Sequence, residues 1–186
     1  MVTHPSEVTV VYPLPADETT YLANSHQTER FDFQCDVAWE TYRRHVLRPF
    51  NELAAEIEPM GVKIVREATL SDLGHACRPE TKVVSLLAHW SDAKVEFSDG
   101  LRTIDEIVGV VPIDYRGIVD LCVCHPEDLT LRLKTERAVM VRWINRRTNP
   151  HIWFRFYRVL FNILHESPTT FFEAIEKASL ALLERK

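Results

Sequence analysis

Glycine and long apolar runs are both scarce in this sequence, and each scarcity excludes a class of protein. The 186 residues include only 5 Gly, so the Gly-rich loops that hold phosphates in P-loop and dinucleotide-binding proteins are missing. No apolar stretch approaches the ~20 residues that span a bilayer. The first ten residues lack the basic and apolar regions of a secretory signal. We therefore expect a cytoplasmic protein with no membrane partner.

The sequence also lacks net positive charge. It has 22 Lys and Arg against 27 Asp and Glu, a formal net charge of -5, which argues against direct nucleic-acid binding. The charge is uneven, because residues 130–160 hold eight basic residues and one acidic residue. That segment carries +7 and the rest of the chain -12. We expect the segment to form a surface for a protein partner or substrate, with candidate residues Arg142, Arg146, Arg147 and Arg155.

The four cysteines do not form a recognisable disulfide or metal framework. They are Cys35, Cys77, Cys122 and Cys124. Without a secretory signal, reduced thiols are expected. The pair Cys122 and Cys124 is followed by His125, yet no second cluster with metal-ligand spacing accompanies it. We therefore expect no metal and no other cofactor.

Apolar runs alternate with helical patterns along the chain. Short runs rich in β-branched residues predict strands at 8–12, 62–65, 83–88, 117–123 and 138–144. Apolar periodicity and capping signals predict helices at 36–57, 103–110, 151–164 and 167–182. Such alternation is typical of an α/β domain with a mostly parallel central sheet covered by helices. We predict one domain over residues 1–186, in which residues 14–34 form an irregular insertion.

Two smaller features of this pattern have structural consequences. Pro49 falls inside the predicted helix 36–57, so that helix either kinks there or restarts with Pro in its first turn. Asp99 and Gly100 form a strong turn signal between two short extended pieces.

Reactive side chains follow two of the predicted strands. His89 comes directly after strand 83–88, and Cys124 after strand 117–123. Active residues of parallel sheets collect beyond the carboxyl ends of neighbouring strands. The spacing between the two residues accommodates one strand-helix-strand crossover, which would bring them side by side. A thiol beside an imidazole is the minimum for nucleophilic catalysis.

These stretches resemble the caspase-like cysteine peptidases, and the bacterial CHAT domains in particular. The matching segments are VVSLLAHW, GIVDLCVCHP and the C-terminal FRFYRVLFNILHESPTTFFEAIEKASLALL, which lie within about residues 80–184. The resemblance implies a three-layer caspase-like fold and a peptide-bond hydrolase. Cys124 would be the nucleophile and His89 the general acid/base. The backbone N–H groups of Cys124 and Trp90 would form the oxyanion hole.

The resemblance also implies a protein substrate and a means of control. CHAT domains commonly lie in larger chains with repeats, which this sequence lacks, so we expect a separate regulatory protein subunit. Ordering of the segments 90–100 and 125–136 would be another means of control. The setting would be a bacterial signalling or defence system.

The sequence departs from the family pattern in two places beside the reactive residues. Trp90 stands where the family usually has Gly after the His, and His125 with Pro126 replaces the small residues after the Cys. These departures favour an alternative, a catalytically degenerate caspase-fold scaffold that binds proteins. A small-molecule enzyme of general α/β type is a third interpretation, which the scarcity of glycine disfavours.

Two further residues lie close to Cys124 in the sequence. Asp120 shares the side-chain parity of Cys124 along the predicted strand, and it would either help to form a pocket for a basic substrate side chain or be a hydrogen-bonded buried carboxylate. His125 is a second imidazole beside the thiol. Adjacent residues at a strand end point apart, so we expect His125 to border a substrate pocket and not to act as the base.

Overall fold

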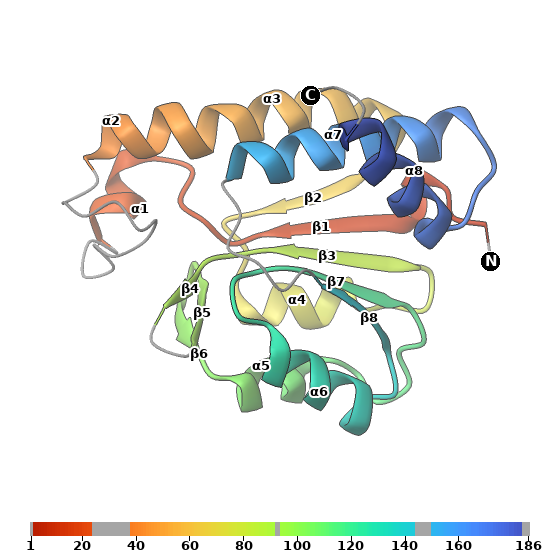
Figure 1. The fold of residues 1–186 in the computed structure, drawn as a ribbon. Helices are drawn as coiled ribbons and strands as arrows, with labels where there is room; N and C mark the ends of the chain where they lie inside the picture. The colour runs from red at the N-terminus through yellow and green to blue at the C-terminus, as the bar shows by residue number, and fades with distance from the viewer. Residues whose placement is uncertain (1, 24–37, 92–93, 144–149, 184–186) are drawn as a thin grey trace.

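The centre of the molecule is a five-stranded sheet in which all strands are parallel. The computed structural model describes residues 2–23, 38–91, 94–143 and 150–183. The sheet has the order β2-β1-β3-β7-β8 (Figure 1). Its strands are β1 (Val8–Tyr12), β2 (Lys63–Arg66), β3 (Val83–Leu87), β7 (Ile118–Cys122) and β8 (Met140–Trp143). Each strand coincides with a predicted apolar run, to within two residues at every end that the structure describes.

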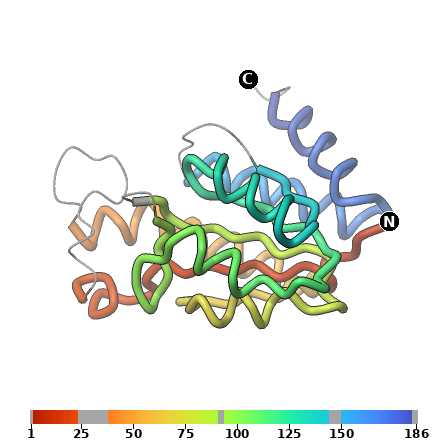
Figure 2. Tube along the Cα trace, turned by 90° about the horizontal axis from the view of Figure 1, so that it is seen from below, coloured from red at the N-terminus to blue at the C-terminus, as the bar shows by residue number. Residues whose placement is uncertain are grey.

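Helices cover both faces of this sheet, as Figures 1 and 2 show. One face is covered by α2 (Trp39–Tyr42), α3 (Arg48–Ile57), α7 (Pro150–Glu166) and α8 (Phe171–Leu183). The other is covered by α4 (Leu70–Ala76), α5 (Ile104–Val110) and α6 (Glu127–Glu136). The predicted three-layer α/β class is therefore confirmed, and the arrangement is consistent with a caspase-like fold.

Alternate residues of the central strands point to opposite faces of the sheet and belong to two separate hydrophobic cores. In β3, Val83 and Leu87 pack toward α3, α7 and α8, whereas Val84 and Leu86 pack toward α4, α5 and α6. All five residues of β3 are buried, as expected for a strand inside a helix-covered parallel sheet. No helix among the described residues is long and apolar enough to cross a lipid bilayer.

The predicted helix 36–57 is divided at its proline. A π-helical stretch, Arg43–Leu47, joins α2 to α3, and Pro49 lies in the first turn of α3. Proline has no N–H to donate and its ring collides with the carbonyl one turn earlier. The wider π turn, in which the Arg48 N–H donates to the Arg43 carbonyl, makes room for that ring. The helix thus continues past Pro49 through a π turn, with Pro49 in the first turn of α3. The predicted cap Asp36 lies outside the described residues.

The structure contains several elements that the sequence pattern did not predict. The segment expected to be irregular, 14–34, contains a short helix, α1 (Glu18–Ala23). Helices α4 and α6 were not predicted either. Two single-turn 3₁₀ helices, η1 (Pro5–Glu7) and η4 (Glu58–Met60), precede β1 and β2.

A small antiparallel sheet follows β3 along the chain. Its strands are β4 (Trp90–Ser91), β5 (Lys94–Phe97) and β6 (Gly100–Arg102), in that order. The predicted Asp99-Gly100 turn joins β5 to β6, and Gly100 has a φ of 122°. Glycine adopts this left-handed region without a steric penalty. The small sheet lies beside the carboxyl ends of the central strands (Figure 1).

Candidate functional site

His89 and Cys124 follow the carboxyl ends of two neighbouring strands in the same register. Strands β3 and β7 are parallel partners, and every paired position differs by 35 in sequence number, from Val83 with Ile118 to Leu87 with Cys122. His89 and Cys124 differ by the same 35. The Ala88 N–H donates to the Cys122 carbonyl at 3.3 Å, so the pairing continues past the last residue of β3. Neighbouring strands lie ~4.8 Å apart, which brings both reactive residues to one edge of the sheet.

Cys124 lies on the bend between β7 and α6. Its side chain is partly exposed. The next residue, His125, has a φ of 50°, a left-handed conformation that non-Gly residues seldom adopt. Glycine is the residue that adopts this conformation most readily. His125 itself is exposed, at the rim where a substrate pocket was predicted.

The start of α6 favours a negative charge near Cys124. Helix α6 begins at Glu127, directly after the Pro126 cap, and the unpaired N–H groups of a helix N-terminus stabilise a nearby anion such as a thiolate. Glu127 and Asp128 in the first turn oppose this effect, but both are exposed and solvent screens them.

Cys122, two residues before Cys124, has a different environment. It is a buried free cysteine in the core beneath α7. Burial raises the pKa of the Cys122 thiol well above its ordinary value, and the neighbouring Asp120 carboxylate raises it further. Thiol reactivity depends on the thiolate, so Cys122 is a structural residue, and Cys124, on the bend after β7, is the more accessible thiol of the two.

A carboxylate that the sequence pattern did not single out lies beside His89. Glu96 Oε2 is 3.6 Å from His89 Nδ1, and Glu96 is 1% exposed. The backbone N–H of Glu96 also donates to the His89 carbonyl at 2.9 Å, so β5 is fixed against this residue. A buried carboxylate beside one ring nitrogen favours the tautomer that carries its proton on that nitrogen.

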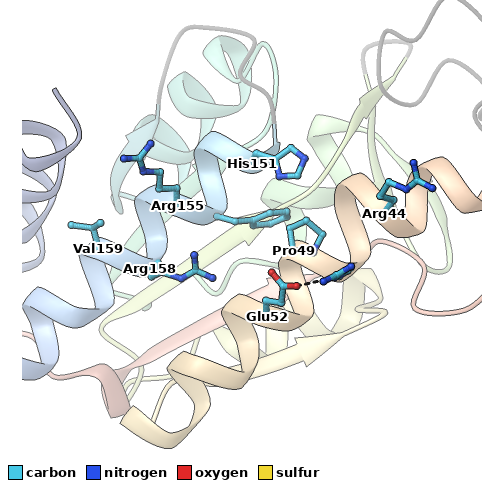
Figure 3. Close-up of a pocket in the computed structure, with 9 residues that line it drawn as sticks. Arg44, Pro49, Glu52, His151, Arg155, Arg158 and Val159 are labelled. Carbon is cyan, nitrogen blue, oxygen red and sulfur yellow. Dashed lines mark hydrogen bonds and ion pairs between the residues drawn. The ribbon is translucent and has the colours of Figure 1, made fainter. Parts of the chain in front are cut away.

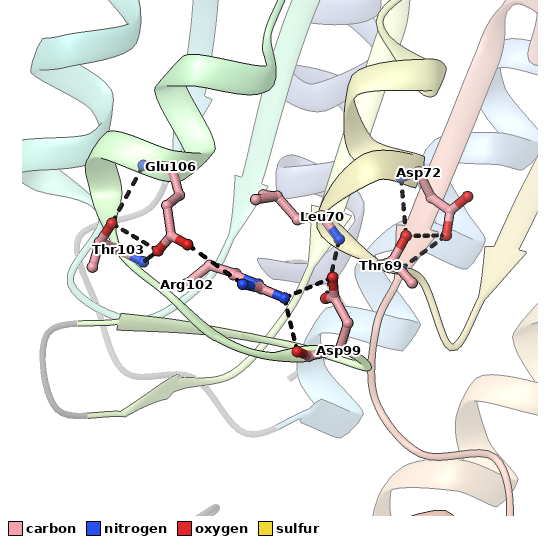
Figure 4. A network of polar contacts seen from close by, with 7 residues as sticks. All are labelled: Thr69, Leu70, Asp72, Asp99, Arg102, Thr103 and Glu106. Atoms are coloured by element: carbon pink, nitrogen blue, oxygen red, sulfur yellow. Dashed lines mark hydrogen bonds and ion pairs between the residues drawn. The ribbon is translucent and has the colours of Figure 1, made fainter.

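The small sheet that carries Glu96 is braced against two helices (Figure 4). Asp99 accepts a hydrogen bond from the Leu70 N–H at the start of α4, at 3.2 Å. Arg102 forms an ion pair with Asp99 at 2.7 Å and a second with Glu106 of α5 at 3.4 Å. Both helices also begin with a capping box. These contacts hold the β5–β6 turn, and with it Glu96, in a fixed position.

Trp90, the predicted oxyanion donor, lies in β4 and pairs with Val95 of β5. The Glu96 N–H donates to the His89 carbonyl, so His89 and Glu96 form a hydrogen-bonded pair of this antiparallel ladder. The next pair, Trp90 with Val95, is therefore a non-hydrogen-bonded one. The alternation of an antiparallel ladder then directs the Trp90 N–H away from β5. The Trp90 ring packs against the core beneath α4, α5 and α6, which is where its bulk is accommodated.

Asp120 is a buried structural carboxylate, and the predicted substrate pocket at this residue is wrong. It is 0% exposed and accepts hydrogen bonds from Ser85 Oγ at 3.0 Å, Arg142 Nη1 at 2.8 Å and Tyr157 OH at 2.6 Å. Burial raises the pKa of Tyr157 well above its usual value, and the Asp120 carboxylate adds to this shift. The other interpretation of Asp120, a hydrogen-bonded structural residue, is the one that the structure supports.

Arg142 is likewise not part of an exposed surface, which corrects the prediction for this residue. It is 8% exposed and lies opposite Asp120 in the β7–β8 ladder. Its guanidinium lies over the rings of Trp153, at 5.3 Å, and Phe156, at 4.8 Å. Burial opposes a charged guanidinium, but the Asp120 carboxylate outweighs it and raises the pKa of Arg142 above its ordinary value.

The other predicted surface residues have separate outcomes. Arg155 is exposed on α7, whereas Arg146 and Arg147 lie outside the described residues. Within the described ranges, no group of three or more His, Cys, Asp or Glu side chains is arranged to hold a metal ion.

Comparisons with known proteins do not add to this picture. No model of a known protein family matches the chain, and a search of curated proteins finds no match.

Proposed function

We propose that the protein is a caspase-like cysteine endopeptidase that cleaves a protein substrate with a Cys124–His89 dyad. One observation carries the proposal: both residues follow neighbouring parallel strands at the common offset of 35. Catalytic groups of parallel sheets collect at this edge. The partial exposure of Cys124 and the adjacent N-terminus of α6 are the conditions expected for a reactive thiol.

The chemistry would be acyl transfer in two steps. Cys124 Sγ attacks the peptide carbonyl while His89 removes its proton, and His89 then donates that proton to the leaving amine. Water, activated by the same imidazole, hydrolyses the thioester and releases the free thiol. The backbone N–H groups of Trp90 and Cys124 would stabilise the oxyanion, and each such donor is worth about 10²–10³ in rate.

Glu96 would act as a positioning residue in this mechanism. Its carboxylate lies 3.6 Å from His89 Nδ1, and it would hold the imidazole with the other ring nitrogen toward Cys124. It would also stabilise the imidazolium that forms during attack. The group plays the part that the third member of a catalytic triad plays in other folds.

The setting of this activity is part of the same proposal. We place the peptidase in the cytoplasm, restrained or activated by a regulatory protein subunit within a bacterial signalling or defence system. The alternative is a degenerate scaffold that binds proteins without cleaving them. The observations that favour it are Trp90 and His125, which stand where the resemblance calls for small residues.

Covalent labelling separates these two functions. The purified protein is treated with a panel of biotinylated peptidyl acyloxymethyl ketones that differ in the residue next to the reactive group, and the modified peptide is identified by mass spectrometry. We expect one adduct, on Cys124. Cys124→Ala should abolish labelling, and His89→Ala should slow it about a hundredfold, because the general base is lost.

Cys122→Ala is the matched control, since it removes a thiol two residues away that the core buries. It should be labelled at the wild-type rate. Equal labelling of wild type and Cys124→Ala, or an unchanged rate in His89→Ala, contradicts the proposed dyad. A folded protein that no probe labels favours the scaffold alternative.

A further inference from the structure

A cationic groove separates the helices α3 and α7 on the outer surface of the molecule. Its volume is about 450 Å³, which lies within the range of small-molecule sites. Its floor is apolar. The polar lining residues are Arg44, Arg48, Glu52, His151, Arg155 and Arg158, and Figure 3 shows them along both walls.

Two of the four arginines have a carboxylate partner. Arg48 pairs with Glu52 at 2.9 Å, and Arg158 pairs with Glu56, just outside the groove, at 2.6 Å. No carboxylate among the described residues pairs with Arg44 or Arg155. Counted over the described residues, the groove therefore keeps about two positive charges without a carboxylate partner, in a chain whose formal net charge is -5.

Two further features add to the positive potential. Helix α7 begins at Pro150, so its first turns, which carry His151 and Arg155, form the positive end of a 17-residue helix dipole. The His151 ring lies 5.8 Å from that of His45, edge to face, and its two ring nitrogens offer further hydrogen-bonding groups beside the groove. The concave shape concentrates the combined field.

We propose that this groove binds a small phosphorylated ligand with two or more negative charges. Guanidinium groups match phosphate oxygens with two parallel hydrogen bonds. Arg44 on one wall and Arg155 on the other would each take phosphate oxygens, while Pro49 and Phe154 bound the site beneath them. The site is independent of the proposed dyad, because none of the residues that line it belongs to the dyad.

The shape of the groove favours a compact polyanion over an acidic peptide. An extended peptide spreads its carboxylates along the chain at ~3.3 Å per residue, and it needs an elongated groove or an open strand edge. Here the two unpaired cations, Arg44 and Arg155, line one cavity from opposite sides (Figure 3). A phosphate chain offers several charges within that span.

Isothermal titration with inorganic pyrophosphate and tripolyphosphate tests the proposal directly. At low ionic strength, tripolyphosphate should bind more tightly than pyrophosphate, and added NaCl should weaken both because it screens the cations. In Arg44→Gln/Arg155→Gln, the affinity for tripolyphosphate should fall at least about tenfold.

Arg78→Gln/Lys134→Gln is the matched control. It removes two exposed cations from α6 and the end of α4, so its net charge equals that of the test variant, and it should bind tripolyphosphate as the wild type does. Equal weakening in both variants overturns the site, because the effect is then one of net charge. Absence of binding at about 1 mM tripolyphosphate also overturns it. Tighter binding of hexaglutamate than of tripolyphosphate overturns the ligand class.

Discussion

The centre of the sheet and its carboxyl edge each bury one carboxylate, and the two are surrounded very differently. Asp120, at the centre, is 0% exposed and accepts hydrogen bonds from three side chains on three elements. Glu96, at the edge, is 1% exposed and lies beside the imidazole of His89. One carboxylate joins two layers of the fold. The other lies against a single imidazole at the end of a strand.

This difference distinguishes a structural carboxylate from a candidate functional one. A buried charge is tolerated when its neighbours neutralise and hydrogen-bond it, and the surroundings of Asp120 do both. A carboxylate beside a titratable ring at the end of two parallel strands has the placement expected of a group that assists proton transfer. The exposed fractions of Asp120 and Glu96 alone do not distinguish the two roles, because both carboxylates are almost fully buried.

Removing the central carboxylate should have the largest effect. Asp120→Ala leaves the Arg142 guanidinium buried without a counter-ion, and we expect the free energy of unfolding to fall by about 3–5 kcal/mol. Urea denaturation followed by circular dichroism measures this loss. A loss below about 1 kcal/mol would contradict the structural role.

A triple variant provides the control for this substitution. Asp120→Leu/Arg142→Met/Tyr157→Phe replaces the carboxylate, the guanidinium and the phenol with apolar groups and keeps Ser85. It should lose less stability than Asp120→Ala, because no unpaired charge remains in the core. If the triple variant were the less stable of the two, the cluster itself would be a net stabilising element.

Changing the carboxylate at the edge should affect reactivity and not folding. In Glu96→Gln, we expect the rate of Cys124 labelling by the peptidyl probes to fall about 10- to 100-fold, since the imidazole loses the group that orients it. The free energy of unfolding should change by less than about 1 kcal/mol, because Gln keeps the size and one acceptor oxygen. The labelling rate is measured from samples quenched at successive times, and the free energy of unfolding is measured by urea denaturation.

The conservative variant tests whether this effect comes from positioning. In Glu96→Asp, the rate of Cys124 labelling should lie between those of Glu96→Gln and wild type. In Glu96→Gln, the factor by which labelling is slowed should differ from one pH to another. A rate lowered equally at every pH, with stability lowered as well, would indicate a structural role for Glu96. Because Cys124→Ala is tested separately, failure of this prediction leaves the dyad intact.

A carboxylate at the surface should have the smallest effect. Asp72 accepts hydrogen bonds from the Thr69 backbone N–H and from its hydroxyl, and these bonds lower the pKa of Asp72, the backbone bond contributing most. A lowered folded-state pKa stabilises the protein above the unfolded-state pKa near 3.8, and this contribution is lost as pH falls below it.

We therefore expect Asp72→Asn to lose about 1 kcal/mol at pH 7, a typical value for a helix cap. The difference from wild type should shrink as the pH of the urea titration is lowered from 6 to about 3. Asp114→Asn is the control, because Asp114 is exposed in a loop, and it should match wild type throughout. If the difference in the free energy of unfolding between Asp72→Asn and wild type grew as the pH fell, the prediction would be contradicted.

The sequence allowed the strands to be predicted better than the helices, and α6 illustrates why. Its residues Leu129, Leu131 and Leu133 alternate with polar ones, which is the period of a strand. In the structure Leu129 and Leu133 are fully buried at the spacing of one helical turn, while Leu131 is 61% exposed. The exposed Leu131 therefore gave the segment the apolar period of a strand, although Leu129 and Leu133 alone have the period of a helix. Helix α4 was missed although its Thr69–Asp72 capping box was present in the sequence.

The placement of the candidate site was predictable, but its partners were not. A strand end followed by His89 or Cys124 is visible in the sequence, as is the parity of Asp120. The pairing of Asp120 with Arg142 depends on the register of β7 with β8, which no local pattern specifies. Glu96 likewise lies next to His89 only because β5 pairs with β4, directly after His89, in the antiparallel sense.

The position of β1 in the sheet has a consequence for how the chain folds. Of the five strands in this sheet β1 comes first along the chain, yet its neighbours come much later, since Thr9 pairs with Lys63 on one side and with Val84 on the other. Contacts between such distant segments form slowly, because a long loop must close before any pairing is gained. During synthesis the apolar side chains of β1 therefore stay exposed to solvent, without both neighbouring strands, until β3 has been synthesised.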